Sequence, residues 1–142
     1  ERLRQKDGIS YGAGTGLMLG SRYKLSTWSL GALTAPQNAM KAEQAIREEI
    51  ERARRDGFTA KELEDAKKGT LQERATNRAQ DNVLANAWTA NMDLGRTFAF
   101  SKQFEDRLRA VTVDQVNAAF RKYIDPARMT FVIAGDAKKG AK

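Results

Sequence analysis

Residues 9–20, ISYGAGTGLMLG, decide the fold that this sequence predicts. Apolar residues and Thr15 occupy the odd positions of the segment, and glycines occupy positions 12, 14 and 16. Such alternation is typical of a β-strand, and glycines along one face let another backbone approach closely. Gly20-Ser21 indicates a turn, and residues 23–33 predict a second strand rich in Tyr, Thr, Trp and Leu. The short connection favours an antiparallel hairpin.

Downstream of the hairpin the sequence predicts helices. The first begins at Pro36-Gln37-Asn38 and keeps an apolar stripe at helical spacing until Gly57, a plausible C-terminal stop. A capping box, Thr59-Ala60-Lys61-Glu62, opens a long helical region to about residue 92, with an interruption near Gly69. A short third helix is expected over residues 98–109.

The last part of the chain predicts one more helix and one more strand. A second capping box, Thr112-Val113-Asp114-Gln115, opens a helix that ends at Asp125-Pro126. Residues 129–134 alternate as a final strand. The order β-β-α-α-α-α-β indicates an α+β fold in which helices cover an antiparallel sheet. Three strands are few for so many helices, so we expect neighbouring strands in sequence outside this chain. Residues 1–137 should form one partial domain, and residues 138–142 a flexible basic tail.

Composition excludes several kinds of chemistry. The 142 residues include no histidine and no cysteine, so Cys/His or Ser/His nucleophilic machinery and the strong zinc ligands are excluded. The first residue is not Met, so we expect a piece of a longer protein. The longest apolar stretches fall far short of a membrane span, so no membrane partner is predicted.

The net charge of +7 leaves more than one interpretation open. Nucleic acid, an acidic membrane surface and acidic peptides are all conceivable partners of a basic protein. Many of the basic residues stand four positions after an acid on a helix, as in Glu43/Arg47, which favours solvated helix faces instead. The glycine run is no dinucleotide motif, because Leu17 stands where the third glycine would be. No nucleic-acid partner is therefore predicted, and a basic nucleic-acid-binding module with steep salt dependence is the weaker alternative.

Arg4 and Tyr11 are the candidate site residues, joined through Gly8. An arginine is a permanently charged fork of donors, and a tyrosine carries a phenolic donor on a rigid ring. Together they could hold a peptide carbonyl or stabilise a developing oxyanion. The alternative is that Tyr11 packs as an ordinary strand aromatic and Arg4 is merely solvated.

An ordered set of motifs over nearly the whole chain resembles the C-terminal, non-zinc domain of the pitrilysin/insulinase family of zinc peptidases, the bacterial members most. The set begins with the segment at residues 4–12, RQKDGISYG, and continues with Pro36-Gln37-Asn38, Gly57-Phe58-Thr59, Glu62-Leu63, Val111-Thr112, Val116, Asp125-Pro126 and residues 131–136. Gln5 stands where an acid is common in the family, and Ile9 where Leu is common.

The resemblance implies one half of a protease. In this family a second half carries Zn²⁺ on a His-x-x-Glu-His motif, and the non-zinc half helps to bind the substrate. Arg4, Gly8 and Tyr11 are the positions that match the substrate-binding element. The implied partners are the zinc-bearing half, on the same chain or another, and an unfolded peptide. This chain alone should hold no cofactor and have no peptidase activity.

The resemblance leaves some features open. It implies export to the periplasm of bacteria, with the cytoplasm as the alternative. Relatives of these peptidases also serve as non-catalytic subunits, so a purely structural role is the alternative function. An exposed sheet edge is an association hazard, so this chain expressed alone is expected to form a homodimer or to swap through its first hairpin.

Overall fold

The computed structural model describes residues 2–136. They form two compact units: unit 1 contains the residues up to Asp56 together with those from Ile124 onward, and unit 2 is Gly57–Tyr123. The tail predicted at residues 138–142 lies outside the described residues. One partial domain over residues 1–137 stays a prediction.

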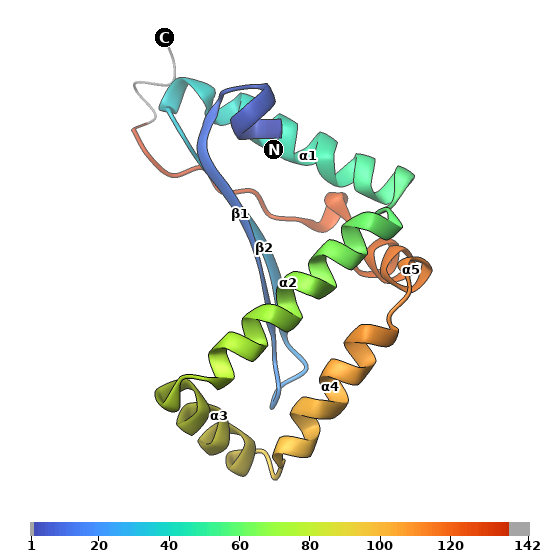
Figure 1. Ribbon diagram of the computed structural model, residues 1–142. Helices are drawn as coiled ribbons and strands as arrows, with labels where there is room; N and C mark the ends of the chain where they lie inside the picture. The colour runs from blue at the N-terminus through green and yellow to red at the C-terminus, as the bar shows by residue number, and fades with distance from the viewer. Residues whose placement is uncertain (1, 137–142) are drawn as a thin grey trace. The chain divides into compact units, whose positions relative to one another are not determined.

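Unit 1 contains the predicted β-hairpin (Figure 1). β1, Ser10–Leu19, pairs antiparallel with β2, Ser26–Thr34. The turn needs a glycine at position 20, because a Cβ there would lie 2.3 Å from the carbonyl oxygen of Leu25 and 2.4 Å from that of Tyr23. The hairpin is therefore confirmed, and its second strand begins three residues later than the sequence indicated.

The core of unit 1 joins the N-terminal turn to the first long helix. η1, Arg2–Lys6, is a single π-type turn. α1, Ala39–Asp56, follows a 3₁₀ turn, η2, at Pro36–Asn38. An apolar cluster of Leu3, Ala42 and Ala45 fills the contact, with Ile9, Ala32 and Ile46 packed against it. Because the α1 residues in the cluster are alanines, little side-chain volume separates the helix from η1 and the hairpin.

The chain returns to unit 1 through a second 3₁₀ turn, η3, at Pro126–Arg128, which contacts α1. The final strand predicted at residues 129–134 is absent, since within residues 2–136 this segment pairs with no strand. It packs on α1 instead, where the guanidinium of Arg47 lies 3.6 Å from the centre of the Phe131 ring. A strand needs a hydrogen-bonding neighbour, and this segment has none among the described residues.

Unit 2 consists of four helices. They are α2 (Ala60–Arg78), α3 (Asp81–Asp93), α4 (Phe98–Ala110) and α5 (Val113–Tyr123). Figure 1 shows α3 turning the chain between α2 and α4, which contact each other. Counting α1, the described residues form five helices where four were predicted, because one predicted segment is divided.

The helical region predicted up to residue 92 is divided at a different place from the one predicted. α2 runs through Gly69 without interruption and ends at Arg78. Gln80, with φ −106° and ψ 118°, is extended and separates α2 from α3. A glycine inside a helix costs only about 1 kcal/mol relative to alanine, so Gly69 alone does not break the helix. Asp81 is the first residue of α3, and its carboxylate is favourable there because the N-terminus is the positive end of the helix dipole.

Both predicted capping boxes are confirmed. The Thr59 hydroxyl accepts the amide of Glu62 at 3.2 Å, and the Glu62 carboxylate accepts the amide of Thr59 at 2.8 Å. Thr112 and Gln115 exchange the same pair of bonds at 3.3 and 3.0 Å. Each box satisfies amides that the first turn of a helix leaves without partners.

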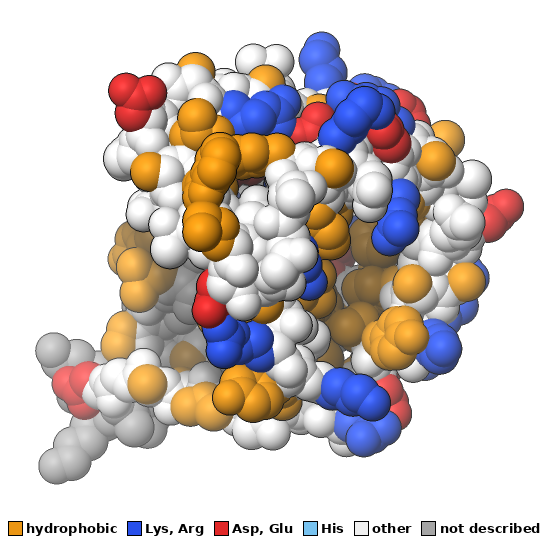
Figure 2. Space-filling model, turned by 90° about the horizontal axis from the view of Figure 1, so that it is seen from below, with side chains coloured by type: hydrophobic (Ala, Val, Ile, Leu, Met, Phe, Trp, Pro, Cys, Tyr) orange, Lys and Arg blue, Asp and Glu red, His pale blue; other side chains and the backbone are white. Residues whose placement is uncertain are grey.

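Aromatic pairs and one buried carboxylate hold unit 2 together. Phe58 and Phe120 meet edge to face with ring centres 5.2 Å apart, and Trp88 and Phe98 do so at 5.1 Å. Glu105, between α2 and α4, is the one side chain of unit 2 that is buried among the described residues. Other large apolar side chains of both units remain at the surface, where orange side chains border basic ones (Figure 2).

The fold class is confirmed as α+β, with two antiparallel strands followed by helices. Within unit 1, α1 contacts β2, and η1 contacts β1. Over the described residues, no helix combines the length and the hydrophobicity that crossing a membrane would require.

Candidate functional site

The N-terminal turn carries two arginines, and the first is fully engaged. Arg2 donates to Glu48 at 2.6 Å, to Glu49 at 3.3 Å and to Asp7 at 3.3 Å. The hydrogen bond from Arg2 is the main reason why the pKa of Glu48 lies below its ordinary value. Arg2 therefore fastens η1 to α1.

Arg4, the second arginine, is exposed. Within residues 2–136 its guanidinium makes no hydrogen bond and no ion pair. Its position is nevertheless fixed, because the preceding residue, Leu3, is buried in the core. Two arginines on one turn thus have different tasks: Arg2 holds the turn, and Arg4 is presented to solvent.

Gly8 ends this turn in a left-handed conformation, with φ +62°. The amide of Asp7 donates to the carbonyl of Arg2 at 2.9 Å, and the amide of Ile9 donates to that of Leu3 at 3.0 Å. A glycine in the left-handed conformation is a common way of ending a helical turn. The glycine matters for the site because it directs the chain from the turn that carries Arg4 into the strand that carries Tyr11.

Tyr11 stands at an irregularity of β1 that the alternation pattern did not reveal. Ser10 pairs with Thr34, and Gly12 pairs with Leu33, so two steps along β1 match one step along β2. Tyr11 is the extra residue of this β-bulge, and its side chain is 73% exposed. Ile9, at the preceding odd position, packs against the core, so the alternation of odd and even positions does not continue through Tyr11. The bulge interrupts the alternation and re-aims the side chain, as bulges do.

The structure therefore places the two candidate donors on contacting elements, η1 and β1. No hydrogen bond joins Arg4 to Tyr11, and the described chain offers no partner to the guanidinium or to the phenol. Both groups remain able to donate to an external acceptor. The exposure of Tyr11 disfavours the alternative of an ordinary packed strand aromatic.

Sequence reasoning missed Arg2 and Ser10, the residues that support the site. Arg2 looks no different from Arg4 in sequence, because its carboxylate partners lie more than forty residues away. A weak signal for Ser10 was present: with Thr15, it is one of two small hydroxyl residues in an apolar and glycine-rich run. Its burial, at 8% exposure, shows that its hydroxyl serves the protein interior.

The residues of this chain do not fit a zinc site. The sequence contains no histidine and no cysteine. Among residues 2–136, no group of three or more carboxylates is arranged so that it could hold a metal ion. The described residues therefore bring together no ligand set for a metal ion.

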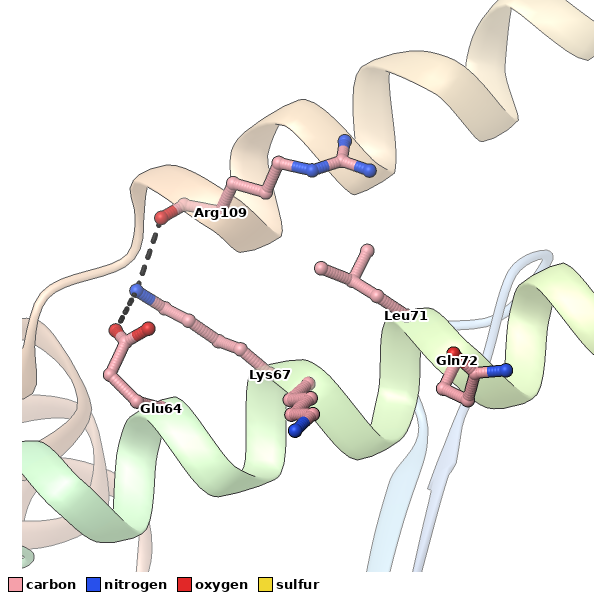
Figure 3. Close-up of a pocket in the computed structure, with 6 residues that line it drawn as sticks. Glu64, Lys67, Leu71, Gln72 and Arg109 are labelled. Carbon is pink, nitrogen blue, oxygen red and sulfur yellow. Dashed lines mark hydrogen bonds and ion pairs between the residues drawn. The ribbon is translucent and has the colours of Figure 1, made fainter.

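Unit 2 contains a shallow groove between α2 and α4 (Figure 3). Lys67 spans it, donating to Glu64 at 2.8 Å and to the carbonyl of Arg109 at 3.1 Å. That carbonyl belongs to the last turn of α4, where a cation is favourable. Lys67 therefore ties the two helices together, and we do not assign the groove as the site.

Residues 1–70 match the family model described as the peptidase M16 inactive domain. The matched segment contains Arg4, Gly8 and Tyr11, and it extends into α2. The match supports the family indicated by the sequence motifs and is consistent with a non-catalytic half of a peptidase. No curated protein sequence matches the chain.

Proposed function

We propose that this chain belongs to the M16 peptidases and is the substrate-binding, non-zinc half of a zinc-dependent endopeptidase. Arg4 and Tyr11 position an unfolded peptide near a metal ion that another domain or chain holds. The observation that carries the proposal is the match of residues 1–70 to an inactive peptidase domain, in which Arg4 and Tyr11 are exposed and have no hydrogen-bond partner within residues 2–136.

The chemistry of the pair suits a peptide carbonyl. The guanidinium of Arg4 supplies charged donors, whose hydrogen bonds are roughly twice as strong as neutral ones. The Tyr11 phenol supplies a neutral donor. Donors that stand ready before the reaction stabilise an oxyanion as it develops. Fixed backbones favour this role, because Arg4 follows a buried leucine and Tyr11 follows a buried serine.

The test is a cleavage assay on the assembled enzyme. This chain is combined with its zinc-bearing half, and hydrolysis of an unfolded peptide is followed with and without a chelator. Removing one oxyanion donor typically lowers kcat by about 10²–10³-fold, so Arg4→Ala and Tyr11→Phe should each lower it by roughly 100-fold. Lys6→Ala, on the same turn, and Tyr23→Phe, beside the hairpin turn, are matched controls that should cleave normally.

Three other outcomes would contradict the proposal. Cleavage that is unaffected by Arg4→Ala and Tyr11→Phe would mean that this chain does not position the substrate through these two side chains. A loaded metal site without any cleavage would indicate a structural subunit. Chelator-sensitive cleavage by this chain alone would show that the metal site has been assigned to the wrong half.

A further inference from the structure

The β-bulge at Tyr11 is stabilised by hydrogen bonds of the preceding side chain, that of Ser10. The Ser10 hydroxyl oxygen lies 2.7 Å from the carbonyl oxygen of Gly12 and 3.0 Å from that of Leu33, and it accepts the amide of Gly12 at 3.1 Å. Ser10 thus contacts both sides of the interrupted ladder, on β1 and on β2.

These contacts lie within the bonding capacity of a serine. A hydroxyl carries one proton and two lone pairs, so it can accept from Gly12 while donating to one of the two carbonyls. A bulge leaves backbone groups without their ladder partners, and an unpaired buried backbone group is costly. The Ser10 hydroxyl therefore provides hydrogen bonds to backbone groups whose regular ladder the bulge interrupts.

We infer that Ser10 is the positioning residue for Tyr11: its hydroxyl holds the bulge that turns the phenol out of the sheet and toward the substrate. This inference rests on the proposed function. Ser10 is buried, while Tyr11 is 73% exposed, so Ser10 acts through its neighbour and does not touch the peptide. A buried alanine would fill nearly the same space but would leave the amide of Gly12 without its acceptor.

Thr15 provides a control on the same strand. Its hydroxyl donates to the carbonyl of Ser29 at 3.0 Å. Thr15 lies in a regular part of the ladder, opposite Leu30, and its side chain is exposed. Thr15→Val removes a hydroxyl from the hairpin at a position outside the bulge. It therefore distinguishes the general effect of losing a strand hydroxyl from the specific effect of losing that of Ser10.

The test is a double-mutant cycle on the assembled enzyme. kcat/KM is measured for the wild type, Ser10→Ala, Tyr11→Phe and the double variant. A hydrogen bond is worth about 1 kcal/mol net, so Ser10→Ala should lower kcat/KM by roughly fivefold. In the double variant it should cause no further loss, because the phenol that it positions is gone. Thr15→Val should behave as the wild type, and Ser10→Thr, which keeps the hydroxyl, should recover most of the activity.

Hydrogen exchange of the Gly12 amide in this chain gives a second readout that does not depend on cleavage. The inference expects faster exchange in Ser10→Ala and unchanged exchange in Thr15→Val. Additive losses of kcat/KM in the cycle, or an equal loss in Thr15→Val, would overturn it. If Tyr11→Phe cleaves normally, the proposed role of the phenol fails. Hydrogen exchange then decides whether Ser10 holds the bulge. An unchanged exchange rate of the Gly12 amide in Ser10→Ala would show that it does not.

Discussion

Units 1 and 2 differ in what they bury. The buried side chains of unit 1 include four apolar ones, Leu3, Ala42, Ala45 and Ile50. Over the described residues of unit 2, the buried side chain is a carboxylate, that of Glu105. Its partners are Arg74 and Arg78 of α2, by hydrogen bonds, and Arg109 of α4, by an ion pair at 3.6 Å.

Unit 1 is thus stabilised mainly by apolar burial, and the contact between α2 and α4 in unit 2 by an ion network. Apolar burial contributes about 25 cal/mol per Å² removed from water and depends little on pH or salt. An ion network needs its charges, and charges that solvent reaches contribute little. The candidate site lies in the unit with the apolar core. The apolar core of unit 1 should therefore tolerate acid and salt that loosen unit 2, whereas the attachment of η1 through the Arg2 ion pairs with Glu48 and Glu49 should not.

Truncation of the apolar core should have the largest effect on stability. Leu3→Ala removes the largest side chain of the unit 1 cluster and should lower the free energy of unfolding by about 2–3 kcal/mol, near the low end for such cavities. Each unit contains one of the two tryptophans. Urea unfolding followed by Trp28 fluorescence in a Trp88→Phe background therefore reports on unit 1.

A surface leucine of the same unit is the matched control. Leu33 is 70% exposed, so Leu33→Ala should cost much less than Leu3→Ala. Equal losses would mean that the small cluster does not determine the stability of unit 1.

Loss of the buried carboxylate should affect unit 2 next most strongly. Glu105→Gln removes the negative charge shared by three arginines. Hydrogen bonds to charged groups are worth about 1.5–3 kcal/mol, and the arginines are partly solvated, so we expect a loss of roughly 1–2 kcal/mol. Trp88 fluorescence in a Trp28→Phe background measures it. Glu73→Gln, on an exposed position of α2, should be neutral, and a comparable loss there would refute a special role for Glu105.

Acid should weaken the same network. The hydrogen bond from Arg78 is the main reason why the pKa of Glu105 lies below its ordinary value of 4.5. A lowered pKa in the folded state stabilises the fold above 4.5, and this stabilisation is lost as the pH falls through the folded-state pKa. Unfolding of unit 2 between pH 6 and pH 3 should therefore depend less steeply on pH in Glu105→Gln than in the wild type. An unchanged slope would exclude Glu105 as the titrating group.

Local signals in the sequence predicted local structure well. The capping boxes at Thr59 and Thr112 and the stop at Gly57 were found where the pattern placed them. Each depends on residues within a few positions, so one stretch of sequence contains both partners. The hairpin is similar, because its short turn leaves few alternatives.

Features that depend on distant partners were missed. The different tasks of Arg2 and Arg4 follow from Glu48 and Glu49, far along the chain. The bulge at Tyr11 is a property of the register with β2, and no pattern within β1 contains it. The unpaired segment at 129–134 shows the same limit, because alternation indicates a strand but supplies no neighbour for it.

Two glycine substitutions in unit 2 should change its stability in opposite directions. Gly57 has φ +78°, and a Cβ there would lie 2.8 Å from the side chain of Asn117. That side chain binds the backbone of Phe58, accepting its amide at 2.7 Å and donating to its carbonyl at 3.2 Å. Gly57→Ala should therefore destabilise unit 2 by about 1–2 kcal/mol through backbone strain and displacement of Asn117.

Gly69 is the matched counterpart within unit 2. It lies inside α2, and a Cβ there would meet nothing within 4 Å. Gly69→Ala should stabilise the unit by about 0.5–1 kcal/mol, because alanine loses less backbone entropy in a helix. Urea unfolding of both variants by Trp88 fluorescence measures the pair. A lower free energy of unfolding in Gly69→Ala would mean that α2 does not pass through this position as an unbroken helix. It would support the interruption near Gly69 that the sequence predicted.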